Sequence, residues 1–450
     1  MARFEGLSGI GLACGNFRST DVAGHIFGNE NTIQTQMKVE AALARVQARL
    51  GIIPQAACDE INRKCDVNLL DEELYRKQYS ITNHVMVCLI RAYAAICDGD
   101  AGEYIHYGTT TQDIIDTANM LQLKEAYELI QEKTQKLRDR IAELARQYRD
   151  TIMMGRTNDQ QAMPITLGFK MATWVDELDR SIERLAEAKD RIFVGSFFGA
   201  AGTLASLEDH GIEIQQALMK ELGLGDSRIM WFTSRDRLVE LVGDLCILTG
   251  TMGRIANEVY NGQRSEVNEL AEGFAPGKVG SSTMPHKRNP FIPGEIVGYS
   301  RLIRSTMVDA LGCMEGTNER DVRTIYMEKE FLARSCCLAD AALDLSILLM
   351  RDLEVHENGI RRNLELLGGL VYAEALMMRL SKTYGRLESH EIIYELAQQA
   401  ISENRNFREL LLADSRTGSV LTEADLDDIM DPANYIGLST YFVDVIAGKN

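Results

Sequence analysis

The sequence predicts an all-α protein in which a central bundle of long helices lies between two smaller helical domains. In several segments of about 25 residues, apolar side chains recur in steps of three and four, as on one face of a helix. No alternating strand pattern of comparable length occurs. Because helices of this length pack best as a near-parallel bundle, we expect an N-terminal helical domain at 1–110, the bundle at 111–365 and a C-terminal helical domain at 366–450.

The apolar stripes predict the individual helices in chain order. The N-terminal domain contains a helix from Asn29 to Leu50, which ends at Gly51 with Pro54 shortly beyond. In the bundle, stripes run from Leu121 to Tyr148, from Pro164 to about Ile192, from Ser234 to Val259 and from Glu295 onward. These stripes offer more apolar surface than one chain can plausibly cover, so we expect the bundle to be shared with other copies of the chain.

The segment from Gly273 to Gly294 interrupts the helical pattern. It carries four glycines and four of the chain's seven prolines, Pro276, Pro285, Pro290 and Pro293. Proline lacks a backbone donor and glycine lacks steric restraint, so no helix is expected to run through it. Because a loop of about 20 residues in a compact domain is usually a lid or a binding loop, we expect the catalytic loop at 273–294.

Charge and cysteine content exclude several classes of function. The formal net charge of -18 argues against nucleic acid as a partner, because phosphate binding needs a basic surface. No uncharged apolar segment is long enough to cross a membrane, and no signal peptide is evident. The nine cysteines have no metal-binding spacing and are typical of buried thiols in a reducing compartment. We expect a cytoplasmic protein without a metal or an organic cofactor.

The string GSSTMPHKRNP at 280–290 closely resembles the GSSxMPxKxNP loop of the fumarase/aspartase superfamily. The resemblance implies that Ser281 is the base that removes a proton from the carbon next to a carboxylate, and that Lys287 and Asn289 bind that carboxylate. Ser282 belongs to the same run and is expected to contact substrate. Physical chemistry supports these roles, because the doubly charged aci-carboxylate that forms needs a point charge and oriented donors.

A second motif, HYGTTTQDIIDTA at 106–118, joins a glycine turn to the start of a helix. From the residues alone, the hydroxyls of Thr110 and Thr111 either cap this helix or bind an anion at its N-terminus. The string resembles the HxGxTSxDxxDT motif of the branch that contains adenylosuccinate lyase and carboxymuconate cycloisomerase. That resemblance implies that Thr110 and Thr111 hold a substrate carboxylate.

A third motif departs from the family pattern. The string GRTNDQQAMP at 155–164 resembles GRTHxQxAxP, with Gln160 at the glutamine and Asn158 in place of the histidine that usually protonates the leaving group. Asparagine cannot titrate. We therefore expect Asn158 and Gln160 to bind substrate, and the acid to be another group.

The alternative acids are two histidines that match adenylosuccinate lyase-type motifs, His106 and His84. The glutamate that commonly pairs with the missing histidine is also displaced, since Gly294 occupies its position and Glu295 follows one residue later. The loss of both members of this pair suggests a different acid rather than an inactive site. Water, or a leaving group that needs no acid, remains an alternative.

One further departure from the family pattern narrows the class of substrate. Adenylosuccinate lyases carry ERDxxxSxxxR for the nucleotide phosphate, whereas here Ile325 and Lys329 stand at the serine and arginine positions that follow Glu319-Arg320-Asp321. The phosphate-binding pair is not reproduced, although Arg320, Arg323 or Lys329 could still meet a carboxylate.

The resemblance as a whole implies a lyase that releases fumarate by reversible β-elimination from a small-molecule dicarboxylate or N-succinyl substrate. It also implies tetramers whose sites take residues from three chains. The alternatives are a carboxymuconate cycloisomerase, an adenylosuccinate lyase and a non-catalytic scaffold protein of the same fold.

Overall fold

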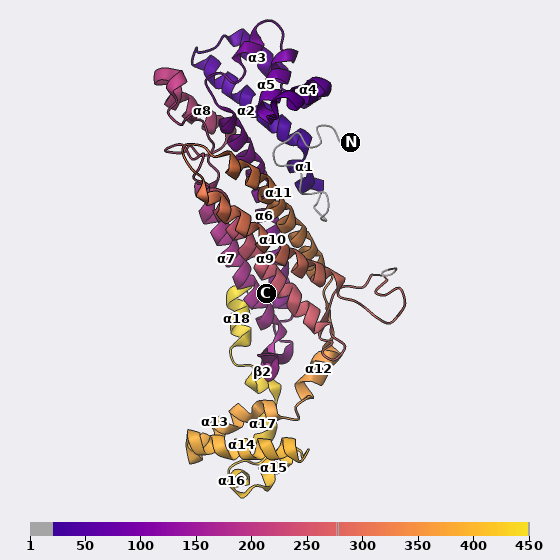
Figure 1. Ribbon diagram of the computed structural model, residues 1–450. Helices are drawn as coiled ribbons and strands as arrows, with labels where there is room; N and C mark the ends of the chain where they lie inside the picture. The colour runs from indigo at the N-terminus through magenta and orange to yellow at the C-terminus, as the bar shows by residue number, and fades with distance from the viewer. Residues whose placement is uncertain (1–20, 276, 278, 449–450) are drawn as a thin grey trace. The chain divides into compact units, whose positions relative to one another are not determined.

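The computed structural model describes residues 21–448 apart from Pro276 and Lys278, and it shows an all-α protein (Figure 1). The described residues form helices α1 to α18, short 3-10 turns and four short strands. The predicted fold class is therefore confirmed. Residues 1–20, which include Cys14 and the start of the predicted N-terminal domain, lie outside the described residues.

The chain divides into two compact units, each made of three segments. The first unit contains Met1–Gln135, Arg180–Arg254 and Glu295–Ser346, and the second contains Lys136–Asp179, Ile255–Gly294 and Ile347–Asn450. Long helices contribute residues to both units, because the divisions fall inside them. The three-domain division expected from the sequence stays a prediction.

The N-terminal helices of the first unit pack around one apolar core. They are α1 (Asp21–Ile26), α2 (Asn29–Arg49), α3 (Gln55–Arg63), α4 (Glu72–Thr82) and α5 (Val85–Ile96). Met37 of α2, Tyr75 of α4 and Leu89 of α5 are buried together in this core. The predicted bounds of α2 are correct to within one residue, and Gly51 follows it with a φ of 73° that suits glycine.

The long helices are α6 (Thr111–Gln147), α7 (Leu167–Ile192), α9 (Asp236–Gly262), α10 (Phe291–Gly312) and α11 (Val322–Arg351), and Figure 1 shows them running alongside one another. Helix α8 (Gly211–Leu222) follows α7. In the first unit the Tyr127 hydroxyl of α6 donates to a carbonyl of α7 at 2.6 Å. The ammonium of Lys133 in α6 lies 2.6 Å from the carboxylate of Asp340 in α11. Polar contacts thus supplement the apolar stripes.

A buried ion triad joins α6, α9 and α11 in the first unit. The Arg235 side chain is fully buried, and its nitrogens lie 2.9 Å from Asp116 and 2.7 Å from Glu328. Burial raises the pKa of Glu328 to about 7. The guanidinium also lies 5.0 Å from the ring centroid of Trp231. Two carboxylates therefore share one buried cation at the start of α9.

The second unit contains an antiparallel hairpin that the sequence did not predict. Strands β1 (Ile152–Thr157) and β2 (Gln160–Thr166) are joined by Asn158 and Asp159, which have positive φ values of 51° and 61°. Two consecutive left-handed residues are typical of a tight hairpin turn. The expected start of α7 at Pro164 is wrong, because Pro164 lies in β2 and the helix begins at Leu167.

The remaining elements of the second unit are helices apart from two short strands, as expected for 366–450. Its elements are β3 (Leu270–Ala271), β4 (Glu354–Val355), α12 (Glu357–Glu365), α13 (Ala373–Tyr384), α14 (Arg386–Ser402), α15 (Phe407–Ala413), α16 (Ser415–Gly418), α17 (Glu423–Ile429) and α18 (Ser439–Ile446). Strands β3 and β4 pair antiparallel. Arg156 of the hairpin makes two hydrogen bonds to the buried carboxylate of Glu269, which also accepts from Asn363. This cluster fixes the hairpin beside β3.

Two other helix boundaries differ from the expectation. Helix α6 begins at Thr111 rather than Leu121, because its first turns bury polar side chains such as Asp113 and Asp116, which hide the apolar stripe. Helix α10 begins at Phe291, inside the proline-rich segment. Pro293 lies in its first turn, where the backbone N–H has no intrahelical partner and its loss costs little. Helix α11 has no counterpart among the predicted elements.

Three further features concern the described residues only. None of their helices is long and apolar enough to cross a membrane. No three of their histidine, cysteine or acidic side chains are grouped as a metal site would require. Their eight cysteines are all free thiols, five of which are buried.

The ion triad predicts a large stability effect. Arg235→Met should lower the free energy of unfolding by about 3–5 kcal/mol, because it leaves two buried carboxylates without their cation. Urea unfolding followed by circular dichroism measures this. Arg228→Met is the control: Arg228 is exposed, so its loss should change stability by about 0.5 kcal/mol or less. Equal effects of the two substitutions would contradict a structural role for the triad.

Candidate active site

The buried carboxylate of Asp113 organises the threonine turn in the first unit. It accepts hydrogen bonds from the backbone N–H groups of Phe198 at 2.8 Å, Gly199 at 2.9 Å and Thr110 at 3.2 Å. The hydroxyls of Ser196 and Thr109 also donate to it. Burial raises the pKa of Asp113 to about 6 against the opposing effect of these donors. One side chain thus fixes the start of α6 against the 196–199 segment.

His106 precedes this turn and is held by a second buried carboxylate, that of Glu40. The Nδ1 atom of His106 lies 2.6 Å from Glu40 Oε1, and the His106 backbone N–H donates to Oε2 at 3.1 Å. The Glu40 side chain is only 1% exposed. When Nδ1 donates to a carboxylate, the second ring nitrogen, Nε2, is available to exchange a proton with a ligand. The left-handed backbone of His106, with a φ of 64°, suits this bent turn.

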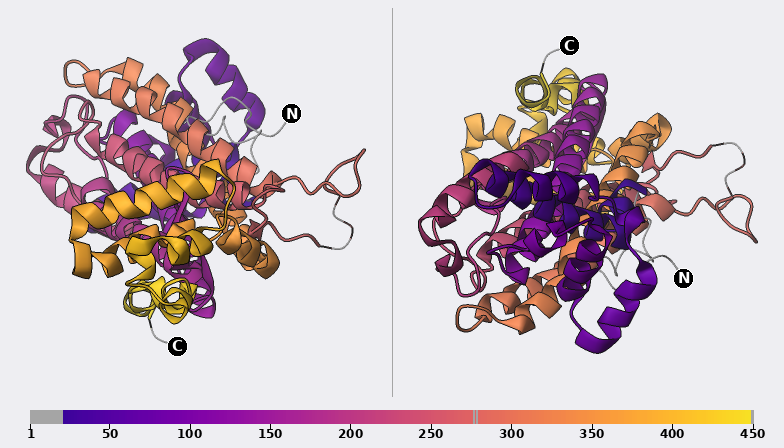
Figure 2. Two further views of the ribbon diagram at one scale, coloured as in Figure 1. Left: turned by 90° about the horizontal axis from the view of Figure 1, so that it is seen from below. Right: turned by 90° about the horizontal axis from the view of Figure 1, so that it is seen from above.

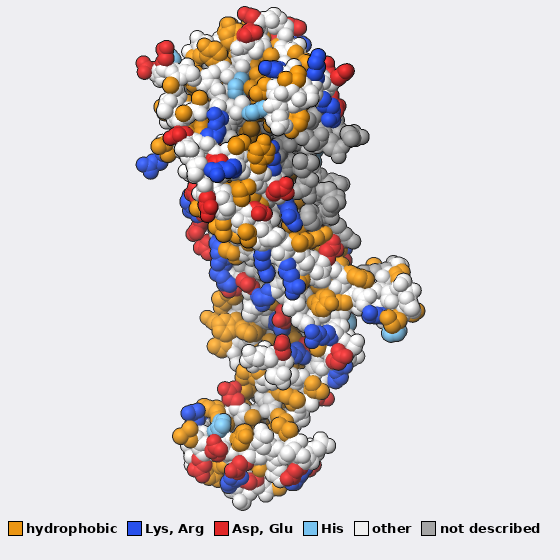
Figure 3. Space-filling view, in the orientation of Figure 1, with side chains coloured by type: hydrophobic (Ala, Val, Ile, Leu, Met, Phe, Trp, Pro, Cys, Tyr) orange, Lys and Arg blue, Asp and Glu red, His pale blue; other side chains and the backbone are white. Residues whose placement is uncertain are grey.

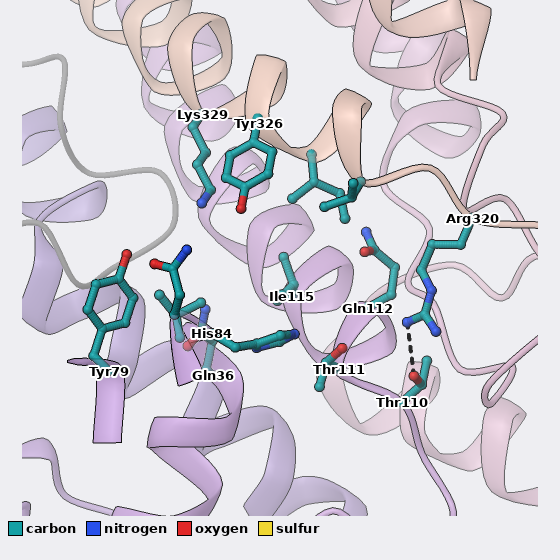
Figure 4. Close-up of a pocket in the computed structure, with 14 residues that line it drawn as sticks. Gln36, Tyr79, His84, Thr110, Thr111, Gln112, Ile115, Arg320, Tyr326 and Lys329 are labelled. Carbon is teal, nitrogen blue, oxygen red and sulfur yellow. Dashed lines mark hydrogen bonds between the residues drawn. The ribbon is translucent and has the colours of Figure 1, made fainter. Parts of the chain in front are cut away.

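His84 and the two threonines line a cavity of about 500 Å³ in the first unit (Figure 4). Lys329 and Tyr326 reach toward it from α11, and His84 and Thr111 face it from the other side. Desolvation, with smaller contributions from Arg320 and Lys329, lowers the pKa of His84. His84 is therefore neutral near pH 7. The complete lining is Gln36, Tyr79, Asn83, His84, Val85, Thr110, Thr111, Gln112, Ile115, Arg320, Val322, Ile325, Tyr326 and Lys329.

The described residues of the loop at 273–290 belong to the second unit and form a long segment without helix or strand (Figure 2). Ser281 Oγ accepts from the backbone N–H groups of Met284 at 3.0 Å and Thr283 at 3.3 Å. The Asn289 amide donates to the Gly280 carbonyl at 2.7 Å. A Cβ at Gly280 would lie 2.3 Å from the Lys287 carbonyl oxygen, so only glycine allows this close approach. The loop therefore has a defined turn around Ser281.

The base of the loop is anchored, whereas its tip is open. The Arg288 guanidinium lies 2.9 Å from Glu354 and 4.4 Å from the ring centroid of Phe274. By contrast, Ser282 and Lys287 are exposed, and Ser281 is half-buried. Hydrophobic, basic and histidine side chains are visible on the loop surface in Figure 3. The tip thus offers its polar side chains to a ligand or to another copy of the chain.

Asn158 and Gln160 lie at the tip of the hairpin in the second unit, and both are exposed. Glu295 is half-buried in α10 of the first unit, where it accepts a hydrogen bond from Tyr299 at 2.7 Å. The predicted site residues therefore form two sets. His84, His106, Thr110 and Thr111 belong to the first unit, whereas Asn158, Gln160, Ser281, Ser282, Lys287 and Asn289 belong to the second.

Comparison with known proteins identifies the family. The sequence model of the family described as Lyase matches residues 16–303, and that of the adenylosuccinate lyase C-terminus matches 369–446. The chain belongs to the fumarase/aspartase superfamily of lyases. The resemblance expected from the loop and the threonine motif is thus confirmed, including the branch that contains adenylosuccinate lyase and carboxymuconate cycloisomerase.

Individual relatives align with nearly the whole length of the chain. Adenylosuccinate lyase of Methanocaldococcus jannaschii is 40% identical over 424 residues, which cover 94% of this chain and 92% of that protein. N-acetyl-S-(2-succino)cysteine lyase of Dickeya dadantii is 36% identical over 435 residues, covering 97% and 96%. The crystal structure of 3-carboxy-cis,cis-muconate lactonizing enzyme from Pseudomonas putida superposes with a TM-score of 0.89 at 31% identity, covering 96% and 97%.

Sequence reasoning missed the two carboxylates that support this site. Asp113 could have been found, because it is the first aspartate of the DxxDT run and the acidic side chain in the first turn of α6. Glu40 leaves a weaker signal. It interrupts the apolar stripe of α2, where it stands at a core position one turn after Met37. A charged residue in a core position is rare unless it is paired.

The His106–Glu40 contact predicts a non-additive loss of activity. Glu40→Gln should lower kcat of the lyase about 10- to 100-fold, the usual effect of removing an orienting partner. His106→Gln should lower it about 10²- to 10⁴-fold as the loss of a general acid. The double variant should be no worse than His106→Gln, because Glu40 acts through His106. Steady-state kinetics with Glu30→Gln, an exposed residue of the same helix, as control measures this. Additive losses would show that Glu40 acts elsewhere.

The hairpin geometry predicts the outcome of restoring the family histidine. Asn158→His should not raise activity of the lyase, because Asn158 occupies a left-handed turn that asparagine adopts more readily than histidine. Comparison of kcat/KM with that of Asn158→Asp, which keeps the turn preference, measures this. A tenfold or greater gain in kcat for the histidine variant would mean that the acid normally belongs at this position.

Proposed function

We propose that this lyase catalyses reversible β-elimination from an N-substituted aspartate, that is, an N-succinyl substrate, and releases fumarate. In this proposal Ser281 removes the Cβ proton, and Lys287 and Asn289 bind the carboxylate beside it. Thr110 and Thr111 hold the second carboxylate. The bond between Cα and nitrogen then breaks, and the leaving nitrogen takes up a proton.

The local environment of Ser281 is the observation that carries the proposal. A serine hydroxyl is a weak base unless its alkoxide is stabilised. Here Ser281 Oγ already accepts two backbone N–H groups, from Thr283 and Met284, in a turn that the Asn289 side chain closes. Lys287 adds a positive charge to the same short loop. These contacts support an oxyanion at Ser281 and an enediolate-like charge on the substrate.

The proposed acid is His106, with His84 as the alternative. His106 is oriented by Glu40, which holds Nδ1 and leaves Nε2 to donate a proton to the leaving group. His84 lies on the wall of the cavity, where desolvation and two neighbouring cations lower its pKa. A neutral imidazole is a poorer acid donor at neutral pH than a charged one. Asn158 and Gln160 are assigned to substrate binding.

A thioether substrate is the second candidate, and the residue at 158 favours it. An amine leaves only after protonation, whereas a thiolate, with an ordinary thiol pKa of about 8.5, leaves without an acid. Asn158 supplies no proton where many family members have histidine. The relative from Dickeya dadantii is named for an S-succino substrate. The cycloisomerase alternative rests on the structural likeness to the lactonizing enzyme.

The proposal includes a homotetramer with shared sites. Exposed apolar side chains on α10, among them Leu302, Val308 and Leu311, offer a surface for another chain. The two sets of site residues would then be contributed by different copies, as the family resemblance implies. Light scattering tests the assembly.

A substrate panel and one substitution test the reaction. We expect ultraviolet absorbance to show fumarate release from at least one N- or S-(1,2-dicarboxyethyl) adduct in a panel that also contains adenylosuccinate and carboxymuconate. With that substrate Ser281→Ala should lower kcat by at least about 10³-fold, because the base is lost. Thr283→Ala, in the same exposed turn, is the control. Near-normal turnover of Ser281→Ala would remove Ser281 from the mechanism, and lactone formation from carboxymuconate without fumarate would favour the cycloisomerase.

A further inference from the structure

We propose that the cavity beside Lys329 binds a carboxylate carried by the leaving group itself. The substrate class is then the succinyl adduct of an amphipathic carboxylic acid, such as an amino acid or a mercapto acid. The inference rests on the proposed function and adds to it a third anionic group on the substrate. The argument depends on the charge, the burial and the apolar wall of the cavity.

The charge of the cavity is opposite to that of the chain. The protein has 66 acidic and 48 basic residues. Yet among the described residues the cavity is lined by two cationic side chains, Arg320 and Lys329, and by no aspartate or glutamate. Such a local excess of positive charge would attract an anion. The composition of this wall is therefore that of an anion site.

Of the two cationic side chains in the cavity, Lys329 gives the stronger evidence for an anion site, because no carboxylate in the described part of the chain neutralises it. Its side chain is half-buried, and desolvation alone lowers its pKa. Among the described residues it has an aromatic partner, since its ammonium lies 4.8 Å from the ring centroid of Tyr326, but it has no ion pair. By contrast, Lys133 lies within 2.7 Å of two carboxylates and Lys170 within 2.7 Å of one. Burying an ammonium without a counter-ion costs free energy, and a bound anionic ligand would offset this cost.

Arg320 connects this cavity to the proposed succinyl site. One guanidinium nitrogen donates to the Thr110 hydroxyl at 3.1 Å, and another donates to the Ala200 carbonyl at 3.3 Å. The two contacts use two of the five N–H donors and orient the group. Figure 4 shows Arg320 with Thr110 on one side of the cavity and Lys329 with Tyr326 on another. A substrate held at Thr110 can therefore extend its leaving group toward Lys329.

The remaining walls favour a carboxylate on an apolar body over a phosphate. The N-terminus of α11 would suit phosphate, but the carboxylate of Asp321, just before this helix, already accepts the backbone N–H of Arg323 at 3.0 Å. Arg323 itself is paired with Asp321. Val85, Ile115 and Ile325 line the space between the polar groups. A cavity of about 500 Å³ is within the usual range for a small organic ligand.

Matched substrates test the proposal. N-(1,2-dicarboxyethyl)-β-alanine and N-(1,2-dicarboxyethyl)-propylamine differ in the leaving-group carboxylate, and the S-adducts of 3-mercaptopropionate and propanethiol form the equivalent sulfur pair. Wild type should prefer the carboxylate-bearing member about 10- to 100-fold in kcat/KM, the effect of a charged hydrogen bond. Lys329→Met should abolish that preference by raising KM for this member alone, and Lys329→Arg should restore part of it. Lys382→Met, an exposed lysine of α13, should leave the preference intact.

A binding measurement separates this inference from the proposed reaction. Calorimetry with Ser281→Ala, with and without Lys329→Met, compares the affinities for the two members of each pair without turnover. If the carboxylate-bearing member binds more tightly than its partner only when Lys329 is present, the result supports the subsite. It does so even if neither adduct is turned over, and in that case the proposed reaction is wrong and the subsite is not. Equal affinities before the replacement, equal losses for both members after it, or no binding would overturn the inference. Tighter binding of adenylosuccinate than of either adduct would show that the cavity binds a phosphate rather than a carboxylate.

Discussion

The reaction proposed for this lyase depends on positive charge that the chain's own carboxylates do not neutralise. Removing a proton from the carbon beside a carboxylate adds negative charge to an anion, so the site needs cations and oriented donors. The chain is strongly acidic, and acidic and basic side chains are interspersed on the face shown in Figure 3. Arg156 and Arg235 are each paired with a carboxylate. In the described part of the chain, Lys287 and Lys329 have no ion pair, which leaves them available to a substrate.

Carboxylates are instead buried where they position other groups. Asp113 gathers five donors and fixes the threonine turn, and Glu40 fixes the orientation of His106. The buried pair of Asp116 and Glu328 shares Arg235 and joins the helices from which the cavity residues project. The first unit therefore has a rigid polar base beneath a positively charged cavity. The second unit supplies a loop that is anchored at its base and open at its tip.

The sequence predicts the parts of this structure that depend on apolar periodicity and proline content. The stripes identify α2, α7 and α9, and the proline-rich segment identifies the loop around Ser281. Periodicity fails at the start of α6, because Asp113 and Asp116 are buried there as polar residues. It also fails at the hairpin, where β1 buries three consecutive residues and β2 contains Pro164, so that neither strand shows a plain alternation.

The residues of the candidate site that lie in family motifs could be predicted from the sequence. Ser281, Lys287, Asn289, Thr110 and Thr111 stand in strings that resemble those of the family. The role of Glu40 could not be predicted from its own segment, because it depends on a contact with a residue 66 positions along the chain. Arg320 and Lys329 were candidates for binding a carboxylate on the sequence alone, but that they line one cavity with His84 follows only from the folded first unit.

The central claim is that the reaction is a β-elimination that passes through proton removal at Cβ. The most direct measurement is the reverse reaction in D₂O, with fumarate and the amine or thiol that the enzyme accepts, analysed by NMR and mass spectrometry of the adduct. The account predicts one stable deuterium at the Cβ of the succinyl group, delivered to a single face. An adduct without deuterium at Cβ, or with deuterium on both faces equally, would contradict enzymatic proton transfer at that carbon.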